Sequence, residues 1–307
     1  MTSHPSLLHR GFTLIEALIV IVITGIIAGT IAIFIKLPMD GYVATTRRAT
    51  LTDIADTAVR RIAREIRLAL PNSVRNPGDN STQCIEFIPT KIGGRYRSAA
   101  DTTNISNPGN SLSFAPIGSS TSSSFDMLWP YGAIPSAFSV AAGDIVVVYN
   151  DGSTSGNAYS GANAIQVASV AAASAPNSTT ITFVNTTTAS PFNYKQLPAA
   201  SPSNQFQVIP AQSHVVSYYC NGGTLYRYTR TLSAAWGGPS NCANMTSGAA
   251  SAVLVTNINN SACILRYDAP GSSTGLSRFG IVAISLQVTQ SGESVNLYQE
   301  VHVDNIP

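Results

Sequence analysis

"RGFTLIEALIVIVITGIIAGTIAIFI", residues 10–35, decides the fold of this chain. From Phe12 to Ile35 the chain holds 24 residues without lysine, arginine or aspartate. As a helix this run would be about 36 Å long, enough to cross a hydrocarbon core of about 30 Å with some tilt. Arg10 precedes it and favours an amino terminus on the cytoplasmic side. The sequence therefore predicts a transmembrane helix at residues 12–38.

Glu16 is the one ionised side chain inside this run. Inserting a helix with a carboxylate at its centre into a membrane costs about 2.5–3.5 kcal/mol on insertion scales. Such a carboxylate usually pairs with another group. No basic residue of the segment lies within a helical turn of Glu16 on the membrane side, so the partner would be a new amino group formed by cleavage, or another molecule. A secretory signal cut near Ala28 to Ala32 is the alternative, but the run is longer than a usual signal core.

The residues Arg10-Gly11-Phe12-Thr13-Leu14-Ile15-Glu16 resemble the processing motif of type IV prepilins. The resemblance implies that residues 1–11 are a leader peptide, that prepilin peptidase cuts between Gly11 and Phe12, and that Phe12 is then N-methylated. It also implies that Glu16 pairs with the terminal ammonium of a neighbouring subunit during assembly. Each charge of such a pair offsets the other's desolvation cost in lipid, so Glu16 would set register rather than catalyse.

A second helical pattern follows the apolar run. Pro38 is expected to kink the chain just beyond the membrane, because proline lacks the backbone donor. Apolar residues then recur at three- and four-residue steps: Leu51, Ile54, Ala58, Ile62, Ile66 and Ala69. We expect an amphipathic helix at residues 39–70, ended by Pro71, with this stripe on a sheet. Its arginine-rich opposite face would be solvated, although anionic lipid or DNA is an alternative ligand.

Residues 71–307 change to short runs rich in β-branched and aromatic residues, separated by glycine, proline, serine and asparagine. Tight reversals are predicted at Asn221-Gly222-Gly223 and at Gln290 to Glu293. The predicted fold class is α+β: a long amino-terminal helix packed on a mainly antiparallel β-sheet domain that lies in the periplasm or outside the cell. The strands expected are Cys84 to Ile88, Asp144 to Tyr149, Thr180 to Val184, Phe206 to Ile209, Ala252 to Thr256 and Cys263 to Tyr267.

Two further stretches narrow the resemblance. "TLTDIADTAVRRIAREIRLALPNSVR", residues 50–75, resembles minor prepilins of the mannose-sensitive haemagglutinin (MSHA) pilus, of the MshO type. "QEVHVDNIP", residues 299–307, resembles the same branch and also pseudopilin J of type II secretion, and the minor pilin PilW is related. The resemblance implies a type IV pilin-like fold, held in the inner membrane by one helix before it enters a pilus. No such resemblance covers residues 90–210.

The implied partners are prepilin peptidase, the major and other minor pilins, the inner-membrane assembly platform and the membrane. Alternatives are a pseudopilin J of type II secretion, or a membrane-tethered hydrolase or sugar-binding adhesin. The net charge of +2 on 307 residues is too small to indicate nucleic acid as the main ligand.

The four cysteines, Cys84, Cys220, Cys242 and Cys263, form no C-x-x-C pair and have no histidine at zinc-ligand spacing. In an exported domain they predict two disulfides rather than a metal site. Sequence leaves three pairings open. We expect Cys220 with Cys242, across the loop between them, which would leave Cys84 for Cys263.

An enzyme is not expected. Residues 271–275 match the hydrolase pattern G-x-S-x-G around Ser273, but that elbow must open a helix and the residues that follow alternate as a strand. The histidines (His4, His9, His214 and His302) form no catalytic pattern. We therefore expect no catalytic residue, metal or cofactor.

Overall fold

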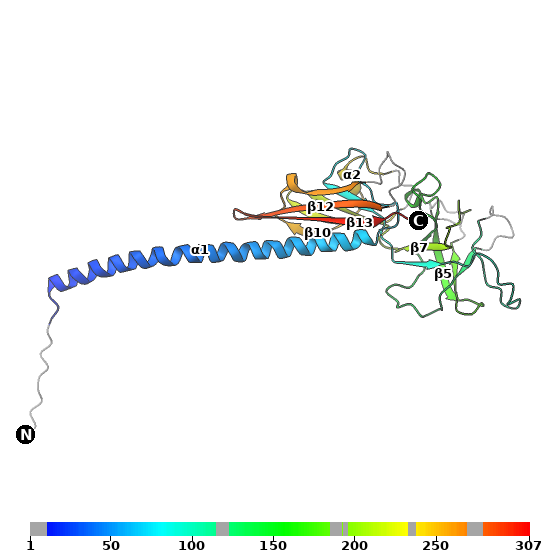
Figure 1. Cartoon of the computed structure of the whole chain (residues 1–307), viewed down its shortest axis with the longest axis horizontal. Helices are drawn as coiled ribbons and strands as arrows, with labels where there is room; N and C mark the ends of the chain where they lie inside the picture. Colours follow the sequence, from blue (N-terminus) through cyan, green and yellow to red (C-terminus); the bar gives the residue numbers. More distant parts are fainter. Residues whose placement is uncertain (1–10, 115–122, 185–191, 193–195, 233–237, 269–278) are drawn as a thin grey trace, which may run out of the picture. The chain divides into compact units, whose positions relative to one another are not determined.

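The structure is a computed structural model that describes residues 11–114, 123–184, 192, 196–232, 238–268 and 279–307. The chain divides into two compact units, Met1–Leu51 and Thr52–Pro307. Helix α1, Leu14–Arg67, is the long blue to cyan helix of Figure 1 and contributes to both. A long helix followed by antiparallel sheets confirms the predicted α+β, pilin-like fold class.

Helix α1 differs from the prediction at two places. It is one element through Pro38, where two helices were expected; proline removes a single i to i−4 bond, and the flanking turns keep theirs. It ends at Arg67, three residues before Leu70, because Leu70 N donates instead to Ile88 O at 2.8 Å. The end of the helix is thus held by the chain that follows the first strand.

Within the second unit, the part of α1 at residues 52–67 buries one face. Ala55, Ala58, Ile62 and Ile66 are buried, whereas Ile54 is 41% exposed. The expected stripe is therefore correct at Ala58, Ile62 and Ile66, whereas Ile54 is turned out of the core and Ala69 lies beyond the end of the helix.

Two antiparallel sheets form the pilin-like part of the second unit. The first has the order β1-β8-β9-β10, with β1 Cys84–Phe87, β8 Val215–Asn221, β9 Thr224–Arg230 and β10 Ala250–Thr256. The second has the order β11-β12-β13, with β11 Ile264–Asp268, β12 Phe279–Gln290 and β13 Glu293–Asp304; β12 and β13 are the paired orange and red strands of Figure 1. The short helices are α2 Cys242–Thr246, η1 Ala158–Ser160 and η2 Asn260–Ala262.

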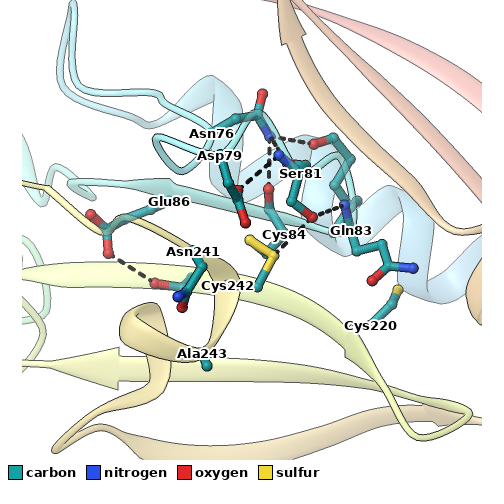
Figure 2. The surroundings of a disulfide bond; sticks show 12 residues. Asn76, Asp79, Ser81, Gln83, Cys84, Glu86, Cys220, Asn241, Cys242 and Ala243 are labelled. Atoms are coloured by element: carbon teal, nitrogen blue, oxygen red, sulfur yellow. Dashed lines mark hydrogen bonds between the residues drawn. A yellow bond between two sulfur atoms is a disulfide. The ribbon is translucent and has the colours of Figure 1, made fainter.

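Side chains tie these elements together. Glu65 of α1 pairs with Arg227 of β9 at 2.9 Å, which fastens the helix to the four-stranded sheet. Asn76 donates to Cys84 O at 2.7 Å (Figure 2). It also donates to Leu265 O at 2.8 Å, so its amide joins β1 to β11.

Both predicted hairpins are confirmed. Gly222 and Gly223 turn β8 into β9 with φ of 57° and 77°, and Ser291 and Gly292 turn β12 into β13 with φ of 49° and 83°. Two successive positive φ angles match the right-handed twist of the strands that they join.

A third sheet, not foreseen as a unit, has the order β2-β7-β4-β5-β6-β3. Its edge strands meet: Tyr96 pairs with Met127, flanked by Arg97 N to Asp126 O at 2.9 Å and Leu128 N to Arg95 O at 2.8 Å. The sheet therefore closes into a small antiparallel barrel filled by its own apolar side chains. Its strands are β2 Ile92–Arg95, β3 Ser124–Met127, β4 Ile145–Val147, β5 Ala164–Ala172, β6 Thr179–Phe183 and β7 Gln205–Ile209 (β5 and β7 are labelled in Figure 1).

The barrel is an insertion between β1 and β8 of the four-stranded sheet. Asp144 joins its two ends, because one carboxylate accepts from Lys91 Nζ at 2.9 Å and from Ala211 N at 3.0 Å. The outer side chains of Ile145 and Ile209 pack in one cluster with Leu70, Ile88 and Val215 of the pilin-like part. Barrel and pilin-like sheets thus share a buried core.

The predicted disulfide pairing is wrong. Cys84 is bonded to Cys242 and Cys220 to Cys263, with Cα atoms 5.7 and 6.5 Å apart. Cys84 lies opposite Tyr219 in the β1–β8 register, so Cys220 points to the other face of the sheet. Cys84 therefore bonds to Cys242 on one face of the sheet, and Cys220 bonds to Cys263 on the other face. Figure 2 shows Cys220 apart from the Cys84–Cys242 bond.

Candidate processing and assembly site

The bond between Gly11 and Phe12 lies just outside the start of α1. The helix begins at Leu14, and Thr13 caps it: Glu16 N donates to Thr13 Oγ1 at 3.3 Å and Ala17 N to Thr13 O at 3.1 Å. Phe12 is 80% exposed. The peptide bond expected to be cut is therefore accessible and non-helical, and the cut would leave the cap and the helix intact.

Gly11 is not required by the chain itself. A Cβ added at Gly11 would have no heavy atom within 4 Å. A requirement for glycine here would therefore come from the active site of another molecule and not from this fold.

The helix that follows is suited to lipid. Its most apolar stretch of 18 residues has a mean hydropathy of 2.9 and no part of that stretch is buried within the protein. The hydroxyls of Thr24 and Thr30 donate to Val20 O at 2.6 Å and to Ile26 O at 2.9 Å, so neither needs a water partner. The residues predicted to span a membrane thus form one exposed, apolar and internally hydrogen-bonded helix, consistent with a membrane anchor.

Glu16 lies in the first turn of this helix. Within the described part of the chain, no side chain donates to its carboxylate. The helix dipole favours an anion at this end, but a dipole does not replace a counter-charge in lipid. Gly11, Phe12 and Glu16 thus lie together at the start of α1, and the acid is available to another molecule.

Thr13 was missed as a member of this site. Thr13-Leu14-Ile15-Glu16 has the S/T-x-x-E spacing of a capping box, in which the threonine oxygen accepts from the amide three residues later. The sequence therefore contained the pattern that fixes where the helix begins.

The second unit contains a buried ionic cluster around Glu86. Glu86 of β1 is fully buried; it accepts from Arg75 Nη2 at 2.7 Å, forms an ion pair with Arg230 of β9 and lies 3.3 Å from Ser217 Oγ. The ring of Tyr159 covers Arg75 at 3.5 Å, and burial raises the pKa of its hydroxyl. This cluster links β1, β9 and the barrel.

The structure describes two of the four histidines, His214 and His302. His214 is buried before β8, its Nδ1 accepts from Leu232 N at 2.8 Å, and burial lowers its pKa while Asp144 opposes the shift. His302 lies on the exposed face of β13. Among the described residues no group of three or more histidine, cysteine or acidic side chains is arranged to hold a metal. Ser273 and its motif lie outside the described residues.

A comparison with protein families matches residues 8–32 to the Prokaryotic N-terminal methylation motif. Neither the curated proteins nor the solved structures that were searched include a match. The matched segment contains the Gly11–Phe12 bond, Thr13, Glu16 and most of the apolar run.

The match supports a prepilin-like subunit, a class that prepilin peptidase processes and that associates with a membrane or a pilus. The match supports a type IV pilin-family protein in particular, and the α1 helix with its antiparallel sheets has the corresponding fold.

Proposed function

We propose that this chain is a minor pilin of an MSHA-type type IV pilus. Prepilin peptidase cuts it between Gly11 and Phe12, Phe12 is N-methylated, and α1 holds the subunit in the inner membrane with its carboxyl-terminal domain in the periplasm. Major and other minor pilins, with the assembly platform, then take it into the fibre. It acts as a structural subunit and not as an enzyme.

The observation that carries this proposal is Glu16, a carboxylate without a side-chain partner in the described part of the chain, in the first turn of an exposed apolar helix. The amino group released at Phe12 lies at the same end of the helix. In a bundle of parallel helices, the Glu16 of one subunit meets the terminus of another, and the two charges offset each other's desolvation. A register shift leaves both charges unpaired.

A position at the tip, in a complex that begins assembly and supports adhesion, is the finer part of the proposal. The inserted barrel adds about 120 residues, 92–209, to the pilin-like sheets. A subunit in the shaft has neighbours on every side, whereas a terminal subunit leaves room for such an insertion. This difference in available space supports a terminal place.

The direct test is the mature amino terminus. The full chain, purified from membranes, is expected to begin at Phe12 with one added methyl group by mass spectrometry. Gly11→Val should leave the precursor uncut, and since a side chain at Gly11 meets nothing within 4 Å, misfolding would not explain that result. An intact leader in the wild type, or a terminus near Ala28, would contradict the proposal.

A pseudopilin J of type II secretion is the second candidate, supported by the resemblance of residues 299–307. Deletion of the gene separates the two. Loss of surface pili with normal exoprotein release supports the pilus subunit, and the reverse supports the pseudopilin.

A further inference from the structure

The loop after β3 exposes an unusual group of large apolar side chains. Leu128, Trp129, Tyr131 and Phe138 are between 46% and 57% exposed. We call residues 128–131 the aromatic ridge. A contiguous apolar patch that is exposed on the surface marks an interaction site.

Hydrogen bonds hold the main chain of the ridge in place. Leu128 N donates to Arg95 O at 2.8 Å, and the hydroxyl of Thr179 donates to Trp129 O at 2.7 Å. On the far side, Ala133 N donates to Pro130 O at 3.2 Å. Strands β2 and β6 thus fix the main chain of the ridge. Because the backbone that carries the rings of Trp129 and Tyr131 is already ordered, binding costs less conformational entropy.

Three hollows of about 900, 450 and 440 Å³ surround the ridge. The largest lies between Tyr131, the rest of the loop and β5. The second places Tyr131 beside Asn107 and Asn177, and the third places Trp129 beside Gln205 and Gln207. Each has the size of a small-molecule site; Tyr131 lines the first and second hollows, and Trp129 lines the third.

The chemistry of the lining restricts the ligand. The described residues that line the three hollows include no carboxylate and one cation, Arg95, whose Nε already donates to Ser203 O at 3.2 Å. A basic peptide would find no counter-charge, and a polyanion would find a single arginine. A lipid chain would cover the amides of the asparagines and glutamines and leave them without hydrogen bonds, at a cost. A pyranose ring fits both halves of the lining, because it has an apolar C–H face and a rim of neutral hydroxyls.

We propose that the aromatic ridge binds a neutral oligosaccharide. Sugar rings stack on Trp129 and Tyr131, and the neighbouring side-chain amides exchange hydrogen bonds with the hydroxyls. Trp129 and Tyr131 are separated in the sequence by Pro130 alone, so their Cα atoms are at most about 7 Å apart. One oligosaccharide is long enough to contact both residues. The inference concerns the barrel and holds for either kind of fibre that the processed subunit joins.

The test uses the full chain in a detergent without a sugar head group, since a glycosidic detergent would compete. The chain has two tryptophans, so Trp236→Phe makes Trp129 the sole tryptophan, and excitation selective for tryptophan then reports on it alone. The probes are chitotetraose, cellotetraose and mannotetraose, with tetragalacturonate as the anionic control. We expect at least one neutral probe to change Trp129 emission saturably, and tetragalacturonate to leave it unchanged.

Variants then locate the site. In calorimetric titrations, Trp129→Ala and, separately, Tyr131→Ala should each weaken binding on the order of tenfold. Tyr298→Ala removes a ring of β13 that is at least as exposed, and this variant should bind like the wild type. Near-ultraviolet circular dichroism verifies that each variant is folded. If Trp129→Ala does not fold, Tyr131→Ala still tests the site.

Three results would overturn the inference: no neutral probe binds at millimolar concentration, tetragalacturonate binds better than its neutral counterparts, or Tyr298→Ala weakens binding as much as Trp129→Ala. None of them bears on cleavage after Gly11, which the mature terminus reports independently.

Discussion

Cys84 of β1 is bonded to Cys242 of α2, 158 residues further along the chain, and the segment between them contains the whole barrel. The second bond, Cys220 to Cys263, closes 43 residues. The two bridges leave opposite faces of the same pair of strands, β1 and β8. The two disulfides therefore cross-link the sheet at β1 and β8, the strands between which the barrel is inserted.

Removing the Cys84–Cys242 bridge by a double serine substitution should destabilise the oxidised chain more than removing Cys220–Cys263. Chain entropy alone gives upper values of about 5 and about 4 kcal/mol for the two loops. Denaturant titrations followed by near-ultraviolet circular dichroism measure the order of the two effects. A non-reducing peptide map that joins Cys220 to Cys242 would show that the pairing described above is incorrect.

Glu86→Gln should lower the free energy of unfolding by about 3 kcal/mol or more, because two arginines beside a buried site would lose their carboxylate. Asp56→Asn is the matched control, since Asp56 pairs with Arg60 on the exposed face of α1 at 2.6 Å and solvent screens that pair. The control should leave the denaturation midpoint nearly unchanged. Equal shifts for both variants would mean that the buried cluster is not a major source of stability.

His214 should make stability fall at acid pH. Burial lowers its pKa in the folded chain, so as pH falls below about 6.5 the unfolded chain takes up the proton first and folding is disfavoured. His214→Asn keeps an acceptor for Leu232 N and cannot titrate, so its stability should change less between pH 7.5 and 5. His302→Asn, on the exposed face of β13, is the control and should show the wild-type change of stability with pH. If both variants reduce that change equally, His214 is not its source.

Glu16→Gln should be cleaved normally but enter fibres at least about tenfold less than the wild type. The amide keeps the size of the side chain and removes the charge, and the penalty of roughly 2.5–3.5 kcal/mol for an unpaired charge in lipid then falls on the neighbouring ammonium. Quantitative blotting of sheared fibres against the membrane fraction measures the ratio. Thr24→Val, which removes an internally bonded hydroxyl from the same helix, is the control that should assemble normally. Normal incorporation of Glu16→Gln would rule out the docking role.

Local features were predictable from the sequence because neighbouring residues decide them. The pairs Gly222-Gly223 and Ser291-Gly292 form the expected reversals, and Thr13 with Glu16 carried a capping pattern that fixes the start of α1. Each predicted strand overlaps a strand of the structure, with ends shifted by at most two residues.

The barrel was not predictable in the same way. Three of its strands were expected singly, but closure depends on Tyr96 meeting Met127, and the strand order brings together segments that are far apart in the sequence. Hydrophobic alternation specifies that a strand has an inner face, and it does not specify which strand lies beside it.

The sequence by itself determined the amino-terminal site, since Gly11, Phe12 and Glu16 lie within one stretch of six residues and the apolar helix needs no tertiary partner to form in lipid. Only the tertiary structure decided the cysteine pairing, the burial of Glu86 between two arginines and the presentation of Trp129 and Tyr131. Those depend on which face of a strand each side chain occupies and on which distant strand covers it, and both are set by packing of the whole domain.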